Sequence, residues 1–236
     1  MSNTDLKFEK QCADALKVEL MPAFGCTEPI AIALAAARAT QLLGKTPQRV
    51  SVACSGNIIK NVKGVVVPST GNLVGIPAAA AVGITGGDPD LGLEVLKNVS
   101  EADILAARKM IDANVICVQK LDTEEKLHLI VEMRCDDDHV LVEIMHTHTN
   151  IVREEKNGKI LFSALPVRDE ENTDDELSGL TLADLYETAS KGDLEPVREL
   201  LEKQIKYNTA ISAEGLKKDY GAHIGRTILS QVRNCV

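Results

Sequence analysis

The chain has 236 residues, of which 44% are hydrophobic and only 3% aromatic, with no tryptophan. This composition can form one large domain or two small ones around an aliphatic, alanine-rich core. The formal net charge of −9 argues against a nucleic-acid partner, which would need a basic face. No apolar run reaches membrane-spanning length, because Arg38 interrupts the run that begins at Ile30.

The six cysteines form no CxxC pair, and their spacing is typical of neither a zinc site nor a small disulfide scaffold. The first ten residues are polar and charged, unlike a signal peptide. We therefore expect reduced thiols in a cytoplasmic protein. Cys54 and Cys117 lie in apolar strand-like runs and are expected in the core, and Cys12 falls on the apolar side of the first helix.

Hydrophobic periodicity predicts helices in the first half of the chain, interrupted by two short strands. Ser100 and Asp103 are spaced as a capping box at the start of one of these helices. The expected helices are Asp5 to Leu20, Ile30 to Leu43, Gly75 to Ile84, Leu91 to Leu96 and Ser100 to Ile111. The expected strands are Arg49 to Cys54 and Gly64 to Val67.

The next part of the chain reads as a set of strands, with a hairpin turn at Asn157-Gly158. The strands are expected at 114–119, 126–134, 139–146, 148–155 and 160–164. We therefore predict an α+β fold. It would have a mostly antiparallel sheet packed with alanine-rich helices, followed by a helical C-terminal segment.

An acidic, polar stretch at residues 168–178 has no core pattern and reads as a solvated linker. After it, Thr181 is expected to cap a helix, and Asp193 a second helix that runs to about Tyr207. The predicted domains are thus 1–167, an α+β domain, and 179–236, a helical segment leading toward a missing C-terminal half.

Cys26 stands just before the alanine-rich helix, in a stretch that suits a helix N-terminus. Thr27 is a good N-cap, and Glu28 and Pro29 suit the first turn. Free backbone N–H groups at this position can stabilise a thiolate, which a metal ligand or a nucleophile requires. A small buried apolar cysteine is the equally ordinary alternative.

Two other groups of residues have the chemistry of a site. Asn57, Lys60 and Asn61 follow a strand and precede the turn Thr70-Gly71, so amides, an ammonium group and backbone N–H groups could hold an amino-acid carboxylate. Two ordinary polar turns would have the same residues.

The third group is a pair of histidines two residues apart. In an extended strand, His146 and His148 would share one face and could bind a metal or move protons. A half-exposed strand face with satisfied hydrogen bonds is the alternative to that interpretation.

The motif Gly-Cys-Thr-Glu-Pro at residues 25–29, followed by the alanine-rich helix, resembles the iron–sulfur L-cysteine desulfidase and L-serine dehydratase-like family. Further matching pieces follow in order along nearly the whole chain. They are Ser55 to Asn61, Val67 to Gly71, His146 to Ile151, Asn208 to Leu216 and Tyr220-Gly221. Members of the family continue into a glycine-rich second half with the other cluster cysteines, whereas this chain stops at Val236.

The resemblance implies a [4Fe–4S] cluster held by three thiolates, with one open iron acting as a Lewis acid on the leaving group. Cys26 would be a metal ligand, and His146 and His148 the catalytic residues, with the base for the α-proton left open between them. The substrate-binding residues would be Thr27, Glu28, Asn57, Lys60, Asn61, Thr70, Gly71 and Asn150.

The resemblance thus predicts the N-terminal part of a lyase that converts L-cysteine or L-serine to pyruvate and ammonia. We expect this chain alone to be inactive, and its partners to be a small amino acid and either a C-terminal half or further copies of itself. The alternative is a non-catalytic amino-acid-binding or regulatory module related to serine dehydratase domains. A thiol enzyme that pairs Cys26 with a histidine is a weaker alternative.

Overall fold

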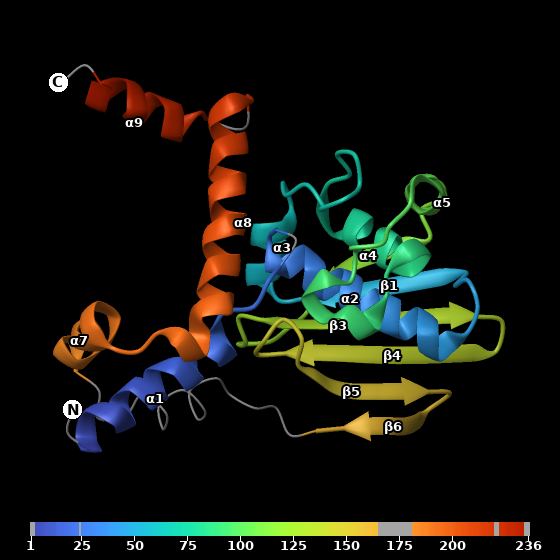
Figure 1. Ribbon diagram of the computed structural model, residues 1–236. Helices are drawn as coiled ribbons and strands as arrows, with labels where there is room; N and C mark the ends of the chain where they lie inside the picture. Colours follow the sequence, from blue (N-terminus) through green and yellow to red (C-terminus); the bar gives the residue numbers. More distant parts are fainter. Residues whose placement is uncertain (1–2, 24, 165–180, 220–221, 234–236) are drawn as a thin grey trace. The chain divides into compact units, whose positions relative to one another are not determined.

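The computed structural model describes residues 3–23, 25–164, 181–219 and 222–233 (Figure 1). The chain divides into two compact units. The sheet unit is Pro22–Asn172, and the helical unit combines Met1–Met21 with Thr173–Val236. None of the described helices combines the length and apolarity needed to span a membrane.

The sheet unit contains a six-stranded sheet in the order β2-β1-β3-β4-β5-β6. Every neighbouring pair is antiparallel except β1 and β2. The strands are β1 (Arg49–Cys54), β2 (Ile116–Lys120), β3 (His128–Cys135), β4 (Asp138–Met145), β5 (Ile151–Lys156) and β6 (Lys159–Ser163). The predicted α+β fold is therefore confirmed, and the Asn157-Gly158 turn joins β5 to β6 with positive φ at both residues, as expected.

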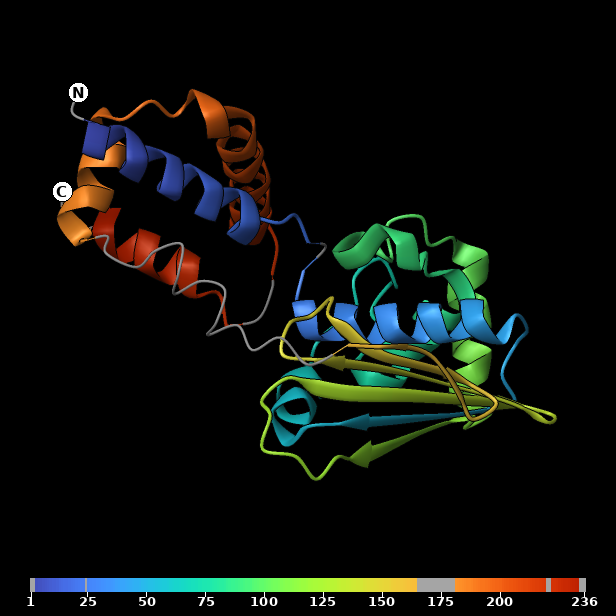
Figure 2. The same cartoon turned by 90° about the horizontal axis from the view of Figure 1, so that it is seen from below.

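Helices α2 (Thr27–Leu43), α4 (Gly75–Gly86) and α5 (Glu101–Asp112) lie over one face of the sheet (Figure 2). The core is made of small aliphatic side chains, with Ile30, Ala33 and Val131 fully buried. Helices α2 and α4 approach so closely that a Cβ atom at Gly83 would lie 2.4 Å from the carbonyl oxygen of Ala33. This close approach requires small residues where the two helices meet.

The local structure differs from the sequence-based expectations in three places. Residues 56–62 form helix α3 (Gly56–Val62), because Ser55 accepts a hydrogen bond from the Ile58 amide and caps it. The expected strand at 64–67 is reduced to an isolated bridge between Val66 and Val74, because a tight loop separates them. Residues 91–96 are mostly in the 3-10 helix η1 (Pro89–Glu94). The Ser100–Asp103 capping box of α5 is confirmed.

The helical unit consists of α1 (Asn3–Glu19), α7 (Leu182–Lys191), η2 (Glu195–Val197), α8 (Arg198–Lys217) and α9 (Ile224–Arg233). Helix α1 packs against α7 and η2, whereas we had placed it in the α+β domain. The predicted linker at 168–178 lies outside the described residues. Thr181 caps α7 as expected, and the helix expected to end near Tyr207 continues to Lys217.

The expected burial of the cysteines holds for Cys12 and Cys54 and is wrong for Cys117, which is exposed. Cys117 pairs with Ser51 of β1, which lies on the opposite face from the buried Val50 and Val52. The thiol therefore lies on the sheet face opposite the helices. The apolar run around Cys117 did not reveal which face it would take.

Candidate functional site at the start of helix α2

The candidate site is built around the first residues of α2. Cys26 itself is the N-cap residue, with extended backbone angles, and its side chain makes no capping hydrogen bond. Thr27 is the first helical residue, so our prediction that Thr27 caps the helix was wrong. The Thr27 hydroxyl is instead within 3.0 Å of Nε2 of His148, which is 121 residues away in the chain.

Glu28 links the cysteine to helix α3. Sγ of Cys26 donates a hydrogen bond to Oε2 of Glu28 at 3.0 Å, and Nδ2 of Asn61 donates to Oε1 of the same carboxylate, also at 3.0 Å. Both oxygens of Glu28 are therefore held by side chains that the sequence predicted for the site. A carboxylate with two donors is fixed in orientation.

Burial and then the hydrogen bond to Glu28 raise the pKa of the Cys26 thiol above its usual value. The same hydrogen bond is the main reason that the pKa of the Glu28 carboxyl is lowered, and Asn61 and His148 act in the same direction. We had expected the helix N-terminus to favour a Cys26 thiolate. The pKa direction is opposite to that expectation, because burial and an adjacent carboxylate both disfavour a charged thiolate.

The structure separates the two histidines that we had placed on one strand face. Strand β4 ends at Met145 and β5 begins at Ile151, so both histidines lie in the connecting loop. His146 has φ of 69°, and its Nδ1 is 3.3 Å from Oε2 of Glu125. Its side chain is only 7% exposed, and its Nε2 makes no hydrogen bond with the described residues. His148 alone of the two contacts the start of α2.

Glu125 is a residue that sequence reasoning missed. It lies between β2 and β3 in a polar segment with no periodic pattern, and nothing local indicates that its carboxylate meets a histidine from another loop. His146 also donates its backbone N–H to Leu127, two residues after Glu125. The two contacts together tie the β4–β5 loop to the segment before β3.

The loop that contains Thr70 and Gly71 lies close to the cysteine loop. A Cβ atom at Gly25 would be 3.2 Å from Cγ of Pro68, so glycine permits this approach, and its φ of 135° also favours glycine. Thr70 is buried, and its hydroxyl donates to the Val67 carbonyl and accepts from the Leu73 amide. Thr70 therefore shapes the loop.

The remaining predicted residues lie on the same elements. Asn57 and Lys60 are on α3 with Asn61, and Lys60 is exposed. The side chain of Asn150 donates to the carbonyl of Met145 at 3.0 Å and closes the β4–β5 loop. The structure thus brings α2, α3 and the β4–β5 loop together, whereas Asn57 and Lys60 make no hydrogen bond with the side chains described at the start of α2.

A three-thiolate cluster requires three thiols at one place in the fold. Among the residues described here, no three Cys, His, Asp or Glu side chains are placed to hold a metal ion. Cys54 lies at the end of β1, and burial raises the pKa of its thiol to about 12. Cys117 and Cys135 lie on β2 and β3. Cys26 is therefore the single thiol that the described residues provide at this site.

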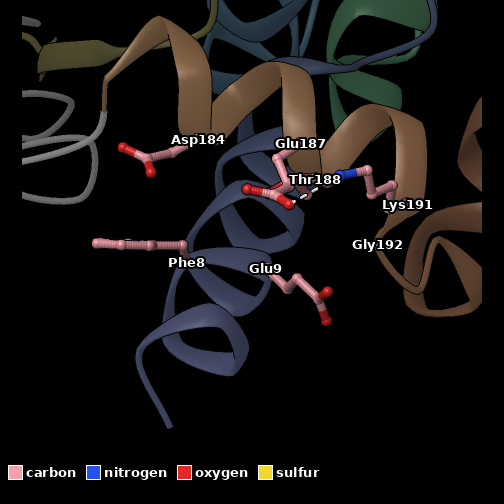
Figure 3. Close-up of a pocket in the computed structure, with 7 residues that line it drawn as sticks. All are labelled: Phe8, Glu9, Asp184, Glu187, Thr188, Lys191 and Gly192. Carbon is pink, nitrogen blue, oxygen red and sulfur yellow. Dashed lines mark hydrogen bonds and ion pairs between the residues drawn. The ribbon is translucent and has the colours of Figure 1, made fainter. Parts of the chain in front are cut away.

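Two cavities are described, and the first adjoins the β4–β5 loop. A groove of about 530 Å³ is lined by residues of α2, β5, β6 and the end of the β4–β5 loop. A second cavity, of about 300 Å³, lies between α1 and α7 within the helical unit (Figure 3). In it, Lys191 forms an ion pair with Glu187 at 3.1 Å. The second cavity contains none of the predicted site residues.

The chain is similar to a UPF0597 protein of Lachnoclostridium phytofermentans, with 47% identity over 220 residues, which are 93% of the chain and 52% of the relative. It is 44% identical over 228 residues to a UPF0597 protein of Finegoldia magna, covering 94% of the chain and 53% of the relative. A UPF0597 protein of Actinobacillus pleuropneumoniae serotype 5b is 42% identical over 231 residues, which are 96% of the chain and 53% of the relative.

No family model matches the chain, and no solved structure matches it. The name shared by these relatives assigns no activity. The chain spans about half the length of the curated relatives it matches.

Proposed function

We propose that the chain is part of an iron–sulfur-dependent lyase that eliminates sulfide from L-cysteine, or water from L-serine, to give pyruvate and ammonia. The observation that carries the proposal is the hydrogen-bonded group of Cys26, Thr27, Glu28, Asn61 and His148. These residues come from three separate parts of the chain, and each of them also belongs to a motif of the resemblance. Motifs that converge on one place in the fold support a shared site.

The residues of this group suit a small zwitterion. The Glu28 carboxylate can receive a substrate ammonium group, and the amide of Asn61 and the ammonium of Lys60 on the same helix can receive a substrate carboxylate. A thiol or hydroxyl on the substrate side chain would then lie toward Cys26. Fixed donors and acceptors of this kind orient a reactant before the reaction starts.

His148 is the better candidate of the two histidines for removing the α-proton. It is partly exposed and touches Thr27, whereas the side chain of His146 is 7% exposed. In the elimination, a ring nitrogen of His148 takes the α-proton, and the C–H electron pair becomes the carbon–carbon double bond. The bond to sulfur or oxygen breaks with its electron pair on the leaving atom. The enamine product tautomerises and hydrolyses to pyruvate and ammonia.

An iron–sulfur cluster would supply a Lewis acid for the leaving group. Cys26 is the residue of this chain that we propose as a ligand. The described residues do not by themselves fit a three-thiolate cluster, since they place one thiol at the site. We therefore propose that the activity belongs to the longer protein, and that this chain alone releases no pyruvate.

The test compares this chain with the intact Lachnoclostridium phytofermentans relative. Both are treated anaerobically with iron and sulfide, supplied with L-cysteine or L-serine, and assayed for pyruvate, ammonia and sulfide. We expect pyruvate and ammonia from the relative and none from this chain. In the relative, Asn at the position aligned with His148 should abolish product formation, and Asn at the position aligned with His139, which lies on β4, should not. Amino-acid binding without product from the intact relative would instead indicate a binding module.

Binding by this chain is tested separately by calorimetric titration with L-cysteine and L-serine. Lys60→Ala should weaken binding by roughly tenfold to a hundredfold, because a charge-assisted hydrogen bond contributes about 1.5–3 kcal/mol. Lys63→Ala is the matched control, since Lys63 is an exposed lysine that caps the C-terminal end of the same helix. Equal affinities for the Lys60 variant and the unchanged chain would remove Lys60 from the site.

A further inference from the structure

Strand β6 is an edge strand with an unusually apolar surface. It pairs with β5 on one side, and no other described strand pairs with it (Figure 1). All five of its residues are exposed, including Ile160 at 56%, Leu161 at 48% and Phe162 at 45%. Its one charged residue is Lys159. Its register with β5 shifts near Leu161, so the strand carries one charge and one irregularity, and its other exposed side chains are mainly apolar. Apolar side chains gathered at an edge in this way indicate an interaction surface.

A groove runs beside this strand. The cavity of about 530 Å³ is lined by Leu161 and Phe162 of β6, by Ile151 of β5 and by polar groups that include Arg38 and Asn150. The unpaired edge thus adjoins a hollow that can take side chains. A strand that pairs with an edge gains affinity from backbone hydrogen bonds and specificity from such hollows.

The polar side of the groove is rigidly held. Nε and Nη2 of Arg38 donate to the two carboxylate oxygens of Glu154 at 2.7 and 3.0 Å. Glu154 is 6% exposed, so its carboxylate is largely withdrawn from water, whereas the side chain of Arg38 is 32% exposed. The groove also includes Thr149 and Asn150, which directly follow His148 in the β4–β5 loop. Its polar end therefore lies on the loop that provides His148 to the candidate site.

We propose that β6 and this groove bind an extended polypeptide segment that belongs to the additional length of the longer relatives. The segment would add a strand to the sheet beside β6 and place apolar side chains against Leu161 and Phe162. The relatives are about twice as long as this chain, so each has enough further residues to include such a segment. An open strand edge specifies the conformation of its occupant, which must be extended to form the hydrogen bonds.

The inference depends on no step of the proposed elimination, so each can fail without the other. The occupant would end next to the β4–β5 loop, which would connect the additional residues of the longer protein with the loop of His148.

Hydrogen–deuterium exchange, read by mass spectrometry on this chain and on the intact Lachnoclostridium phytofermentans relative, tests the proposal without any mutation. The amides aligned with β6 should exchange more slowly in the relative by roughly tenfold or more, after correction for intrinsic rates. The amides of β3, in the middle of the sheet, should show equal protection in both proteins. Equal exchange of β6 in the two proteins would overturn the proposal.

A second copy of this chain is the competing occupant, and light scattering on the chain alone decides it. We expect the mass of a monomer, with fast exchange in β6. A dimer in which β6 is protected would show that the edge binds another copy, and would also overturn the proposal.

Substitution in the intact relative adds a further check. A lysine at the position aligned with Phe162 should restore fast exchange in β6. A lysine at the position aligned with Leu105, which is 60% exposed on α5, should leave β6 protected. If both variants leave the protection of β6 unchanged, Phe162 and its groove do not hold the segment.

Discussion

The thiol of Cys26 donates its hydrogen bond to the carboxylate of Glu28, two residues further along the chain, at 3.0 Å. A cysteine at a helix N-terminus is ordinarily expected to be acidic. Here the helix also places a carboxylate in its first turn, directly beside the sulfur. Burial and then the hydrogen bond to this carboxylate raise the pKa of the thiol, so the arrangement opposes the thiolate that a helix N-terminus alone would favour.

Removing the charge of Glu28 should make Cys26 more reactive. Glu28→Gln lowers the pKa of the thiol, so more thiolate is present at a given pH, and alkylation by iodoacetamide near neutral pH should be faster by roughly twofold to tenfold. Mass spectrometry of labelled peptides measures the rate at each cysteine. Glu101→Gln, in the first turn of α5, is the matched control and should not change the rate at Cys26.

The order of labelling among the cysteines should follow exposure and thiol acidity. Cys117 is exposed and should react first, Cys26 is partly buried and should follow, and Cys54, whose pKa burial raises to about 12, should react last. Rates are read from the same labelled peptides in the folded protein. Faster labelling of Cys54 than of Cys26 would contradict the burial that the structure assigns to it.

The hydrogen bond from Asn61 to Glu28 should contribute to stability as well as to the site. Asn61→Ala removes a donor to a partly buried carboxylate, and should lower the free energy of unfolding by about 1–2 kcal/mol. Urea denaturation measures the change. Asn57→Ala on the same helix, where the structure describes no hydrogen bond for the side chain, should cost less than about 0.5 kcal/mol. Equal effects of the two substitutions would show that the hydrogen bond to Glu28 does not account for the loss of stability.

Two glycines in helices should respond in opposite ways to alanine. Gly83→Ala would place Cβ 2.4 Å from the Ala33 carbonyl oxygen, and pushing α2 and α4 apart should cost about 1–3 kcal/mol. Gly215 lies in α8 with no atom within 4 Å of an added Cβ, so Gly215→Ala should stabilise the helix by up to about 1 kcal/mol. Thermal unfolding followed by circular dichroism distinguishes the two. A stabilising Gly83→Ala would contradict the close packing of α2 on α4.

The ion pair between Arg38 and Glu154 should be much more important than the surface pairs. Arg38→Met leaves a carboxylate that is 6% exposed without its partner, and should cost about 2–4 kcal/mol. Lys97→Met breaks the exposed pair with Glu94 and should cost less than about 1 kcal/mol. Denaturant unfolding at low and high salt measures both. A large salt dependence of the Arg38 effect would indicate that the pair is more solvated than the structure shows.

Local sequence determined most of the elements. The apolar alternation of Arg49 to Cys54 predicted β1 with its observed bounds, and the capping box at Ser100 and the cap at Thr181 placed the starts of two helices. These signals lie within a few residues of one another, so the chain specifies them without reference to the fold. The α+β class followed from the same patterns. Helix α3 was missed because turn residues at its start concealed the spacing of Ile58 and Val62, although that spacing is present in the sequence.

The sequence also indicated which side chains belong to the candidate site, but only the tertiary structure decided which of them meet. The contact between Thr27 and His148 joins residues 121 positions apart. His146, which has a positive φ that no local pattern predicted, meets Glu125 from another loop. The sheet face on which Cys117 lies and the raised pKa of the Cys26 thiol also depend on the tertiary structure. Side-chain pairing and burial depend on which distant segments pack together, and the free energy of that packing is a property of the whole fold.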